Sequence, residues 1–216
     1  MVFATASFAQ KPTEGSLLTE ARFNIASNQA NFDLPSLRLR YFIAEDMALR
    51  LDLGVNGKKT TAYVVDPTDE KNTGSNELKT SGFTLGLGVE KHFSGNERFS
   101  PYMSAGLGYL TSKGTATWTD YNSGSYQKDS KADINSSQSN TLGFNLGFGA
   151  DYWIGKSFYL GAEFGFGFNS TKRPELTSTY DDGTTKREVK SQEIKSSGFE
   201  TSTLTGGSFR IGFALK

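Results

Sequence analysis

Apolar and polar residues alternate with a period of two along most of this chain. The clearest run is Trp153–Asn169, in which every second residue from Phe158 to Phe168 is apolar and the residues between them are mostly Gly, Glu or Asn. A period of two predicts a β-strand with two chemically different faces. The run also has the length of about ten residues that a tilted strand needs to cross a bilayer.

Seven further segments share this pattern, so the sequence predicts eight strands in all. The expected ranges of all eight strands, including the run already described, are Ser16–Ala26, Pro35–Ala44, Met47–Asn56, Ser81–Phe93, Pro101–Ser112, Asn140–Trp153, Trp153–Asn169 and Thr203–Leu215.

The connections between these segments alternate in length. Three are short, and four are longer and polar: Ser27–Leu34, Gly57–Thr80, Lys113–Ser139 and Ser170–Ser202. This alternation predicts an up-and-down meander, and an even strand number places both termini on the short-turn side. Short periplasmic turns and longer extracellular loops are typical of bacterial outer-membrane proteins. We therefore expect an all-β fold, an eight-stranded antiparallel up-and-down transmembrane β-barrel.

The apolar face could point inward, as in a soluble barrel of the lipocalin type, or outward to lipid. The polar face carries many glycines, which weaken a strand and have no use on a water-facing surface. A narrow, tightly curved lumen does need small residues. The apolar face also holds more large side chains than a small barrel could enclose, so the sequence favours the inverted, lipid-facing arrangement.

The inward face would then hold five arginines and five carboxylates: Glu20, Arg22, Arg38, Arg40, Arg50, Asp52, Glu90, Asp151, Glu163 and Arg210. Buried charges are tolerated when they are paired and hydrogen-bonded. The planar Arg fork suits bidentate contacts with carboxylates. Such a network could line a pathway for ions or solutes, or it could plug the lumen. Because eight strands leave room for little beyond side chains, we favour the plug.

Aromatic residues flank the short turns, which is where an interfacial girdle would lie on the periplasmic side. A general preference of aromatic residues for strands is the alternative explanation. The residues assigned to the girdle are Tyr41, Phe93, Tyr102, Tyr152, Trp153 and Phe158.

Composition narrows the possible partners. The 23 basic and 23 acidic residues cancel, which argues against nucleic acid as a partner. The chain has no cysteine, so it forms no disulfides, and it has no apolar run of about 18 residues that would form a transmembrane helix. Residues 1–9 resemble the end of a secretory signal peptide, with Ser7 and Ala9 at the small-residue positions, and residues 10–216 would form the barrel domain.

Three phrases carry a family resemblance: Leu85–Val89, Ala105–Tyr109 and Gly143–Trp153. The sequence around them resembles the small outer-membrane β-barrel families related to OmpA, OmpX and OmpW, over roughly residues 16–216. The resemblance implies a location in the outer membrane of a Gram-negative bacterium. The end of the chain departs from it, since such barrels usually end in an aromatic residue and here Phe213 lies three positions early.

Enzymatic chemistry has weak support. His92 is the single histidine, and His92-Phe93-Ser94 has the spacing of outer-membrane lipid A deacylases, with Glu90 or Glu97 as orienting acids. It would lie at the periplasmic end, away from the outer leaflet. The turn Tyr180–Gly183 has too few ligands for Ca²⁺. We therefore expect a monomer that is not an enzyme and has no cofactor or metal. Its partners would be outer-membrane lipid, lipopolysaccharide and a protein bound by the extracellular loops.

Overall fold

The computed structural model describes residues 11–24, 36–202 and 208–215, and they are almost entirely β-strand. Eight strands form a closed antiparallel ring. They are β1 (Leu17–Asn24), β2 (Ser36–Ala44), β3 (Met47–Val65), β4 (Thr73–His92), β5 (Phe99–Asn122), β6 (Ser125–Trp153), β7 (Phe158–Arg173) and β11 (Ser208–Leu215). Neighbours in sequence pair with each other, and β7 closes the ring by pairing with both β6 and β11. The described residues include no helix that could span a membrane.

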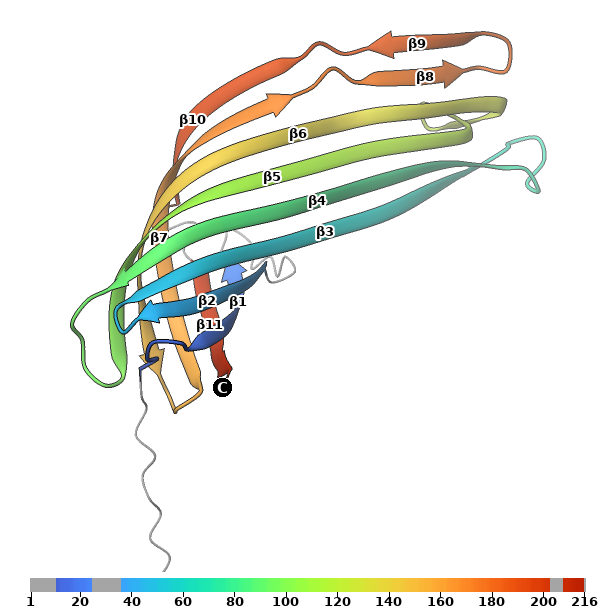
Figure 1. Ribbon diagram of the computed structural model, residues 1–216. Helices are drawn as coiled ribbons and strands as arrows, with labels where there is room; N and C mark the ends of the chain where they lie inside the picture. Colours follow the sequence, from blue (N-terminus) through green and yellow to red (C-terminus); the bar gives the residue numbers. More distant parts are fainter. Residues whose placement is uncertain (1–10, 25–35, 203–207, 216) are drawn as a thin grey trace, which may run out of the picture.

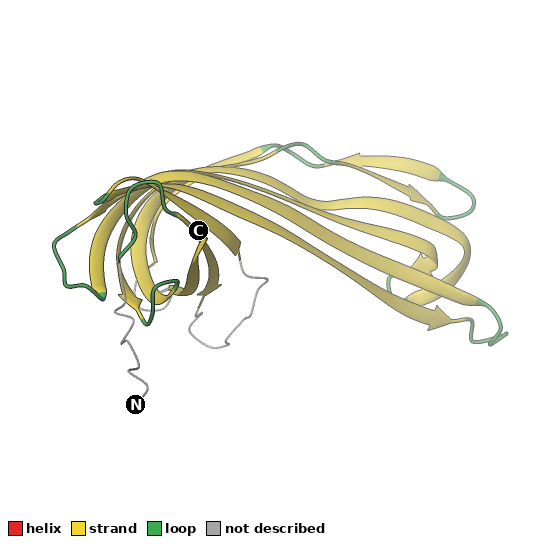
Figure 2. Ribbon diagram, turned by 60° about the horizontal axis from the view of Figure 1, so that its bottom comes forward, coloured by secondary structure: helices red, strands yellow, loops and turns green. Residues whose placement is uncertain are grey.

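The first and last strands pair along their length, with Leu17 opposite Leu215. Both therefore end at the same edge of the barrel as the short turns, as the even strand number predicts. Figure 1 shows the C-terminus at this edge and Figure 2 shows the strands curving around to enclose the lumen.

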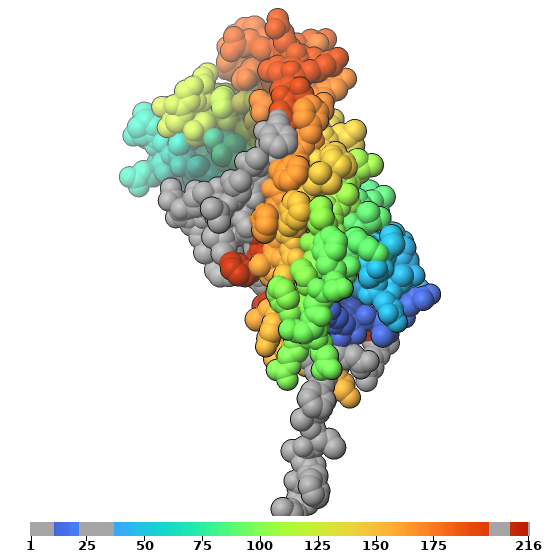
Figure 3. All heavy atoms as spheres, turned by 90° about the vertical axis from the view of Figure 1, so that its left-hand side faces the viewer, coloured from blue at the N-terminus to red at the C-terminus, as the bar shows by residue number. Residues whose placement is uncertain are grey.

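The outward face is apolar, and this confirms the inverted arrangement. Leu87 and Leu107 are each 60% exposed at mid-strand, while Arg38, Arg40 and Arg210 on the opposite face are almost fully buried. Since successive side chains of a strand point to opposite faces, one register places most large apolar residues of the ring toward lipid and the buried arginines and carboxylates toward the lumen. Figure 3 shows this wall from outside, where β5, β6 and β7 form a continuous surface.

The polar connections are mostly strand rather than loop, and on this point the prediction was wrong. Strands β3 and β4 pair without interruption from Met47–Lys91 to Val65–Thr73, and β5 and β6 continue to a turn at Ser123–Gly124. Beyond Leu53, β3 pairs only with β4 among the described residues. The long strands therefore continue past the ring as a curved sheet that projects to one side (Figures 1 and 2).

Three shorter strands extend this sheet within the segment expected to be the last long loop. They are β8 (Thr177–Asp181), β9 (Lys186–Lys190) and β10 (Ile194–Ser202). The β8–β9 hairpin adds to the edge of β6, and β10 pairs with the distal half of β7. Residues 208–215 of the last predicted strand form β11, while its residues 203–207 and the expected loop 27–34 lie outside the described residues.

Candidate functional site

A layer of buried apolar side chains lies inside the barrel at the end that carries the short turns. Leu18, Phe42, Ala48, Trp153 and Tyr159 come from five different strands and are almost completely buried against one another. The Trp153 and Tyr159 rings lie 4.5 Å apart between their centroids.

Arg40 forms the centre of a first layer of charges above the apolar layer. Its Nη1 donates to Glu20 and to Asp151, at 2.8 Å each, and its Nε donates to Glu90 at 2.8 Å. Arg210 reinforces this layer by donating to Asp151 Oδ1 at 2.7 Å and to both oxygens of Glu20. These five side chains come from β1, β2, β4, β6 and β11, so the layer joins most of the ring.

A second layer lies next to the first and is organised around Glu163. Arg38 contacts both oxygens of this carboxylate, at 3.2 and 3.4 Å, and donates through Nε to Asp52 at 2.7 Å. Arg50 donates to Glu163 Oε1 at 3.0 Å and forms an ion pair with Glu90, which links the two layers. Paired, multiply hydrogen-bonded charges of this kind are costly to separate, because each partner would be left uncompensated in a buried site.

Two tyrosines complete the network. Tyr102 donates to Glu163 at 2.5 Å, and Tyr159 donates to Glu20 at 2.6 Å. Arg40 lies over both rings, 5.4 Å from the Tyr102 centroid and 5.7 Å from the Tyr159 centroid, which adds cation–π attraction. The turn-flanking positions of Tyr102 and Tyr159 predicted that both lie at the lipid interface, but both side chains are buried in the lumen. The signal that Tyr159 faces inward is its position in phase with Gly161 and Glu163 on the polar face of the strand.

Glycines on the inward face provide the space that this network occupies. A Cβ atom at Gly161 would lie 2.6 Å from Arg210 Nη2, and one at Gly147 would lie 2.5 Å from Ser104 Oγ. A side chain at either position would push neighbouring side chains of the lumen out of place. The large charged side chains therefore fit only because the residues beside them are glycines. The tight lumen expected from the sequence is therefore a lumen filled by side chains.

Nine of the ten predicted lumen charges meet in these two layers, as the contacts above show. The tenth is Arg22, which belongs to β1 and pairs through its backbone with Arg210, but its side chain lies outside the described residues. What the sequence could not supply was the pairing pattern, since partners such as Arg38 and Glu163 are 125 residues apart.

The predicted aromatic girdle is only partly a lipid-facing feature. Tyr41, Phe93 and Tyr152 are each exposed by nearly half, and Phe158 lies on the outward face against Phe213. Tyr102 and Trp153 are instead almost fully buried inside the barrel, so their assignment to the girdle was wrong. Both lie one position out of phase with their outward neighbours, and a single step along a strand moves a side chain to the other face.

His92 lies inside the barrel and contacts Ser100, not Ser94. Its Nδ1 lies 2.9 Å from Ser100 Oγ, and its Nε2 lies 3.3 Å from Glu90 and 3.0 Å from Arg40. A serine, a histidine and a carboxylate are thus in line, but His92 and Ser100 are both buried and Phe42 and Tyr102 pack on the imidazole. A catalytic serine must be reached by its substrate, and this serine is enclosed.

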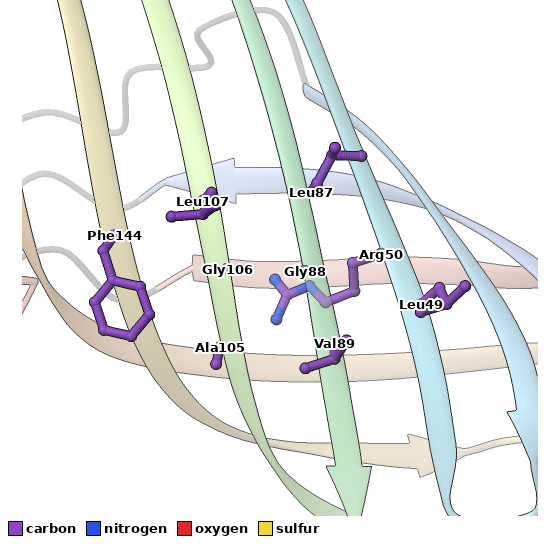
Figure 4. Close-up of a pocket in the computed structure, with 9 residues that line it drawn as sticks. All are labelled: Leu49, Arg50, Leu87, Gly88, Val89, Ala105, Gly106, Leu107 and Phe144. Carbon is purple, nitrogen blue, oxygen red and sulfur yellow. The ribbon is translucent and has the colours of Figure 1, made fainter.

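Other candidate sites are less developed. The outer wall has a shallow apolar groove over Gly88, Gly106 and Ala105, and Figure 4 shows large apolar residues around it. In the β8–β9 turn, Asp181 and Asp182 accept hydrogen bonds from the backbone of residues 183–185, so they stabilise the turn. Within the described ranges, no group of three or more His, Asp or Glu side chains could hold a metal ion.

Comparison with known proteins identifies the family. Residues 15–173 match the model of the outer membrane protein beta-barrel domain. This chain belongs to that family. It is therefore an outer-membrane β-barrel protein, and its apolar outer face contacts lipid. No curated protein matches the sequence.

Three solved structures are similar to this chain at low sequence identity. The N-terminal β-barrel domain of Pseudomonas aeruginosa OprF has 18% identity and a TM-score of 0.44, with 94% of this chain and all of that chain covered. The outer membrane protein AlkL has 12% identity and a TM-score of 0.40, with 100% and 97% covered. The Escherichia coli outer membrane protease OmpT has 9% identity and a TM-score of 0.41, with 93% and 91% covered.

Proposed function

We propose that this barrel is a non-conducting anchor that presents its projecting sheet at the cell surface. The filled lumen carries this proposal: the apolar layer and two layers of ion pairs occupy the cross-section at the periplasmic end. A conducting pore needs a continuous water-filled path, as in barrels of 16 or more strands. The proposal also assigns no catalysis to the chain, because His92 and Ser100 are enclosed.

The concave face of the projecting sheet supports a role in binding a protein partner. Trp118 on β5 lies 5.5 Å from Tyr121 and 6.2 Å from Tyr180 of β8, measured between ring centroids. Arg187 on β9 lies over the Tyr180 ring at 5.2 Å. Trp, Tyr and Arg dominate the binding energy of protein interfaces, since they bury large areas with few rotatable bonds. The face that would meet the partner is thus formed by β5, β8 and β9.

Site-specific photo-crosslinking on intact cells tests the binding role. A photoreactive residue at Tyr180 should give a discrete adduct, while the same residue at Glu188 should give none. Glu188 lies on β9 of the same hairpin, where the register places it on the opposite face from Tyr180 and Arg187. Equal labelling from both positions, or none from Tyr180, would contradict the role of this face.

The alternative function is a narrow channel for small solutes, permitted by glycine on the inward face. Liposome swelling separates the two. Liposomes holding the refolded protein should swell no faster than protein-free liposomes in solutes the size of an amino acid or a pentose. Faster swelling in the smallest solute would favour the channel.

A further inference from the structure

The outward apolar residues that face lipid form a band around the barrel, here called the apolar belt. On four strands a lysine lies at a fixed spacing beyond this belt. On β4, β5 and β7 the last apolar residue of the outer face is followed, four positions further from the periplasm, by a lysine. On β3 the same spacing separates Val55 from Lys59, and Tyr63 and Val65 lie further out on the same face. The pairs are Val55 and Lys59 on β3, Phe83 and Lys79 on β4, Tyr109 and Lys113 on β5, and Phe168 and Lys172 on β7. An even number of positions keeps each lysine on the same face as the apolar residue. The lysines therefore face outward, where the belt ends.

Two of these lysines lie directly opposite each other. Lys59 and Lys79 are cross-strand partners in the β3–β4 ladder. Like charges at directly opposite positions destabilise a sheet. Among the described residues, Glu77 is the one carboxylate paired with them, 2.5 Å from each ammonium group, so it neutralises one charge of the two. With Lys113 nearby, the group retains an excess of two positive charges.

The same residues surround a hollow in the surface. It has a volume of about 510 Å³ and is lined by Lys59, Lys79 and Lys113, with Gly57, Ser81 and Thr115 as small residues among them and Lys58 and Thr80 completing the lining. Small floor residues and long cationic side chains leave space for an anionic group and supply ammonium donors around it. Lysine is a compact charge with three donors and binds phosphate in this way.

The distance from the apolar belt identifies the source of the anion. Four residues extend roughly 13 Å along a strand, which is roughly 9 Å along the membrane normal at a tilt of about 45°. The polar zone of a bilayer is about 5–8 Å deep on each side. Lysine side chains lying near a membrane reach toward its interface while their stems cover apolar surface. The lysine backbone therefore lies just beyond the polar zone, and the three side chains can reach back to the level of lipid phosphates.

We propose that Lys59, Lys79 and Lys113 bind a phosphate group of an outer-leaflet glycolipid. The site lies on the outer wall, so it is independent of whether the lumen conducts or the concave face binds a partner. Glu77 holds the lysines in place when the site is empty and competes with the phosphate for two of them.

Binding of bisphosphorylated lipid A by the full-length refolded protein tests the proposal. Neutralising the three lysines (K59Q/K79Q/K113Q) should weaken binding on the order of 100-fold, since each lysine near an anionic lipid surface contributes about fivefold. The arginine variant K59R/K79R/K113R should retain binding. E77Q should strengthen it, because the competing carboxylate is removed. K71Q, in the distal turn of the same hairpin, removes one lysine charge away from the membrane and should leave affinity unchanged.

Two further ligands separate the sources of phosphate. Dephosphorylated lipid A should bind the wild-type protein no better than it binds the triple glutamine variant. Inorganic phosphate at the same concentration should not displace lipid A. Unaltered binding by the folded triple glutamine variant, an equal loss in K71Q, or displacement by inorganic phosphate would each overturn the proposal. All variants are compared after their folding has been verified by circular dichroism and by heat-dependent gel migration.

Discussion

Arg40 on β2 donates a hydrogen bond of 2.8 Å to Asp151 on β6, although these strands lie on opposite sides of the eight-stranded ring. The same guanidinium contacts Glu20 on β1 and Glu90 on β4. One side chain therefore spans the lumen and joins walls that are distant in sequence. Closing the lumen and stabilising the barrel are consequences of the same contacts.

Replacing Arg40 should strongly destabilise the barrel. Arg40→Gln leaves Glu20, Glu90 and Asp151 short of their shared cation in a buried site, and breaking buried ion pairs in this way costs about 3–5 kcal/mol. Urea unfolding of the protein in lipid vesicles measures the change. Lys91→Gln provides the control, because the Lys91–Asp46 pair is exposed and such pairs contribute little. Equal stability of the two variants would contradict a structural role for the network.

Glycine on the inward face should be required only where neighbouring atoms approach closely. A Cβ atom at Gly165 would lie 2.6 Å from the carbonyl oxygen of Leu146, whereas one at Gly108 would meet nothing within 4 Å. Gly165→Ala should therefore cost about 1–3 kcal/mol, the usual range for overpacking. Gly108→Ala, on the same face of the barrel, should be tolerated. Unfolding midpoints of the two variants distinguish this account from a general preference for small residues.

Charge should be tolerated above the apolar belt and not within it. Leu107 is an outward residue of β5 at mid-membrane, and Leu107→Arg should cost about 2–4 kcal/mol. Thr117 lies on the same strand and face but ten residues further from the periplasm, so Thr117→Arg should change stability little. Folding yields into vesicles provide the readout. If both variants folded equally well, the assignment of the lipid-facing band would be wrong.

His92 should stabilise the lumen without acting in catalysis. His92→Phe removes the partner of the buried Ser100 hydroxyl, which costs about 1–3 kcal/mol for an unsatisfied group. Ser94→Ala alters the exposed serine of the sequence motif and should be neutral. Stability and release of fatty acid from lipid A are measured together. Hydrolysis by the wild-type protein that is lost in His92→Phe would support the enzymatic alternative.

The alternation of apolar and polar residues was sufficient to predict the ring of strands, which face of the ring points to lipid, and which charged residues point into the lumen. This works because a strand exposed to lipid on one face must be apolar at every second position. Arg38, Arg40 and Arg210 could therefore be placed in the lumen without knowing their partners. The partners could not be predicted, since ion pairs such as Arg38–Glu163 depend on how the ring closes.

The projecting sheet was missed because the long connections contain few apolar residues, and polar segments were assigned to loops. Within one of them Thr115, Thr117 and Thr119 alternate with Ala116 and Trp118, and threonine is common in strands. Weighing β propensity alongside polarity would have extended β5 beyond Ser112. The Lys59–Lys79 pair was beyond reach for a different reason, because opposite positions can be known only once the register of the hairpin is fixed.

Single-channel recording in planar bilayers tests the closed lumen most directly. The account predicts no current steps from wild-type protein shown to be folded by heat-dependent gel migration. Reproducible steps whose ion selectivity changes in the R38Q/E163Q variant would contradict it, because that variant neutralises an ion pair of the lumen while keeping the side-chain volume. Such a result would place Arg38 and Glu163 along an ion pathway instead of in a plug.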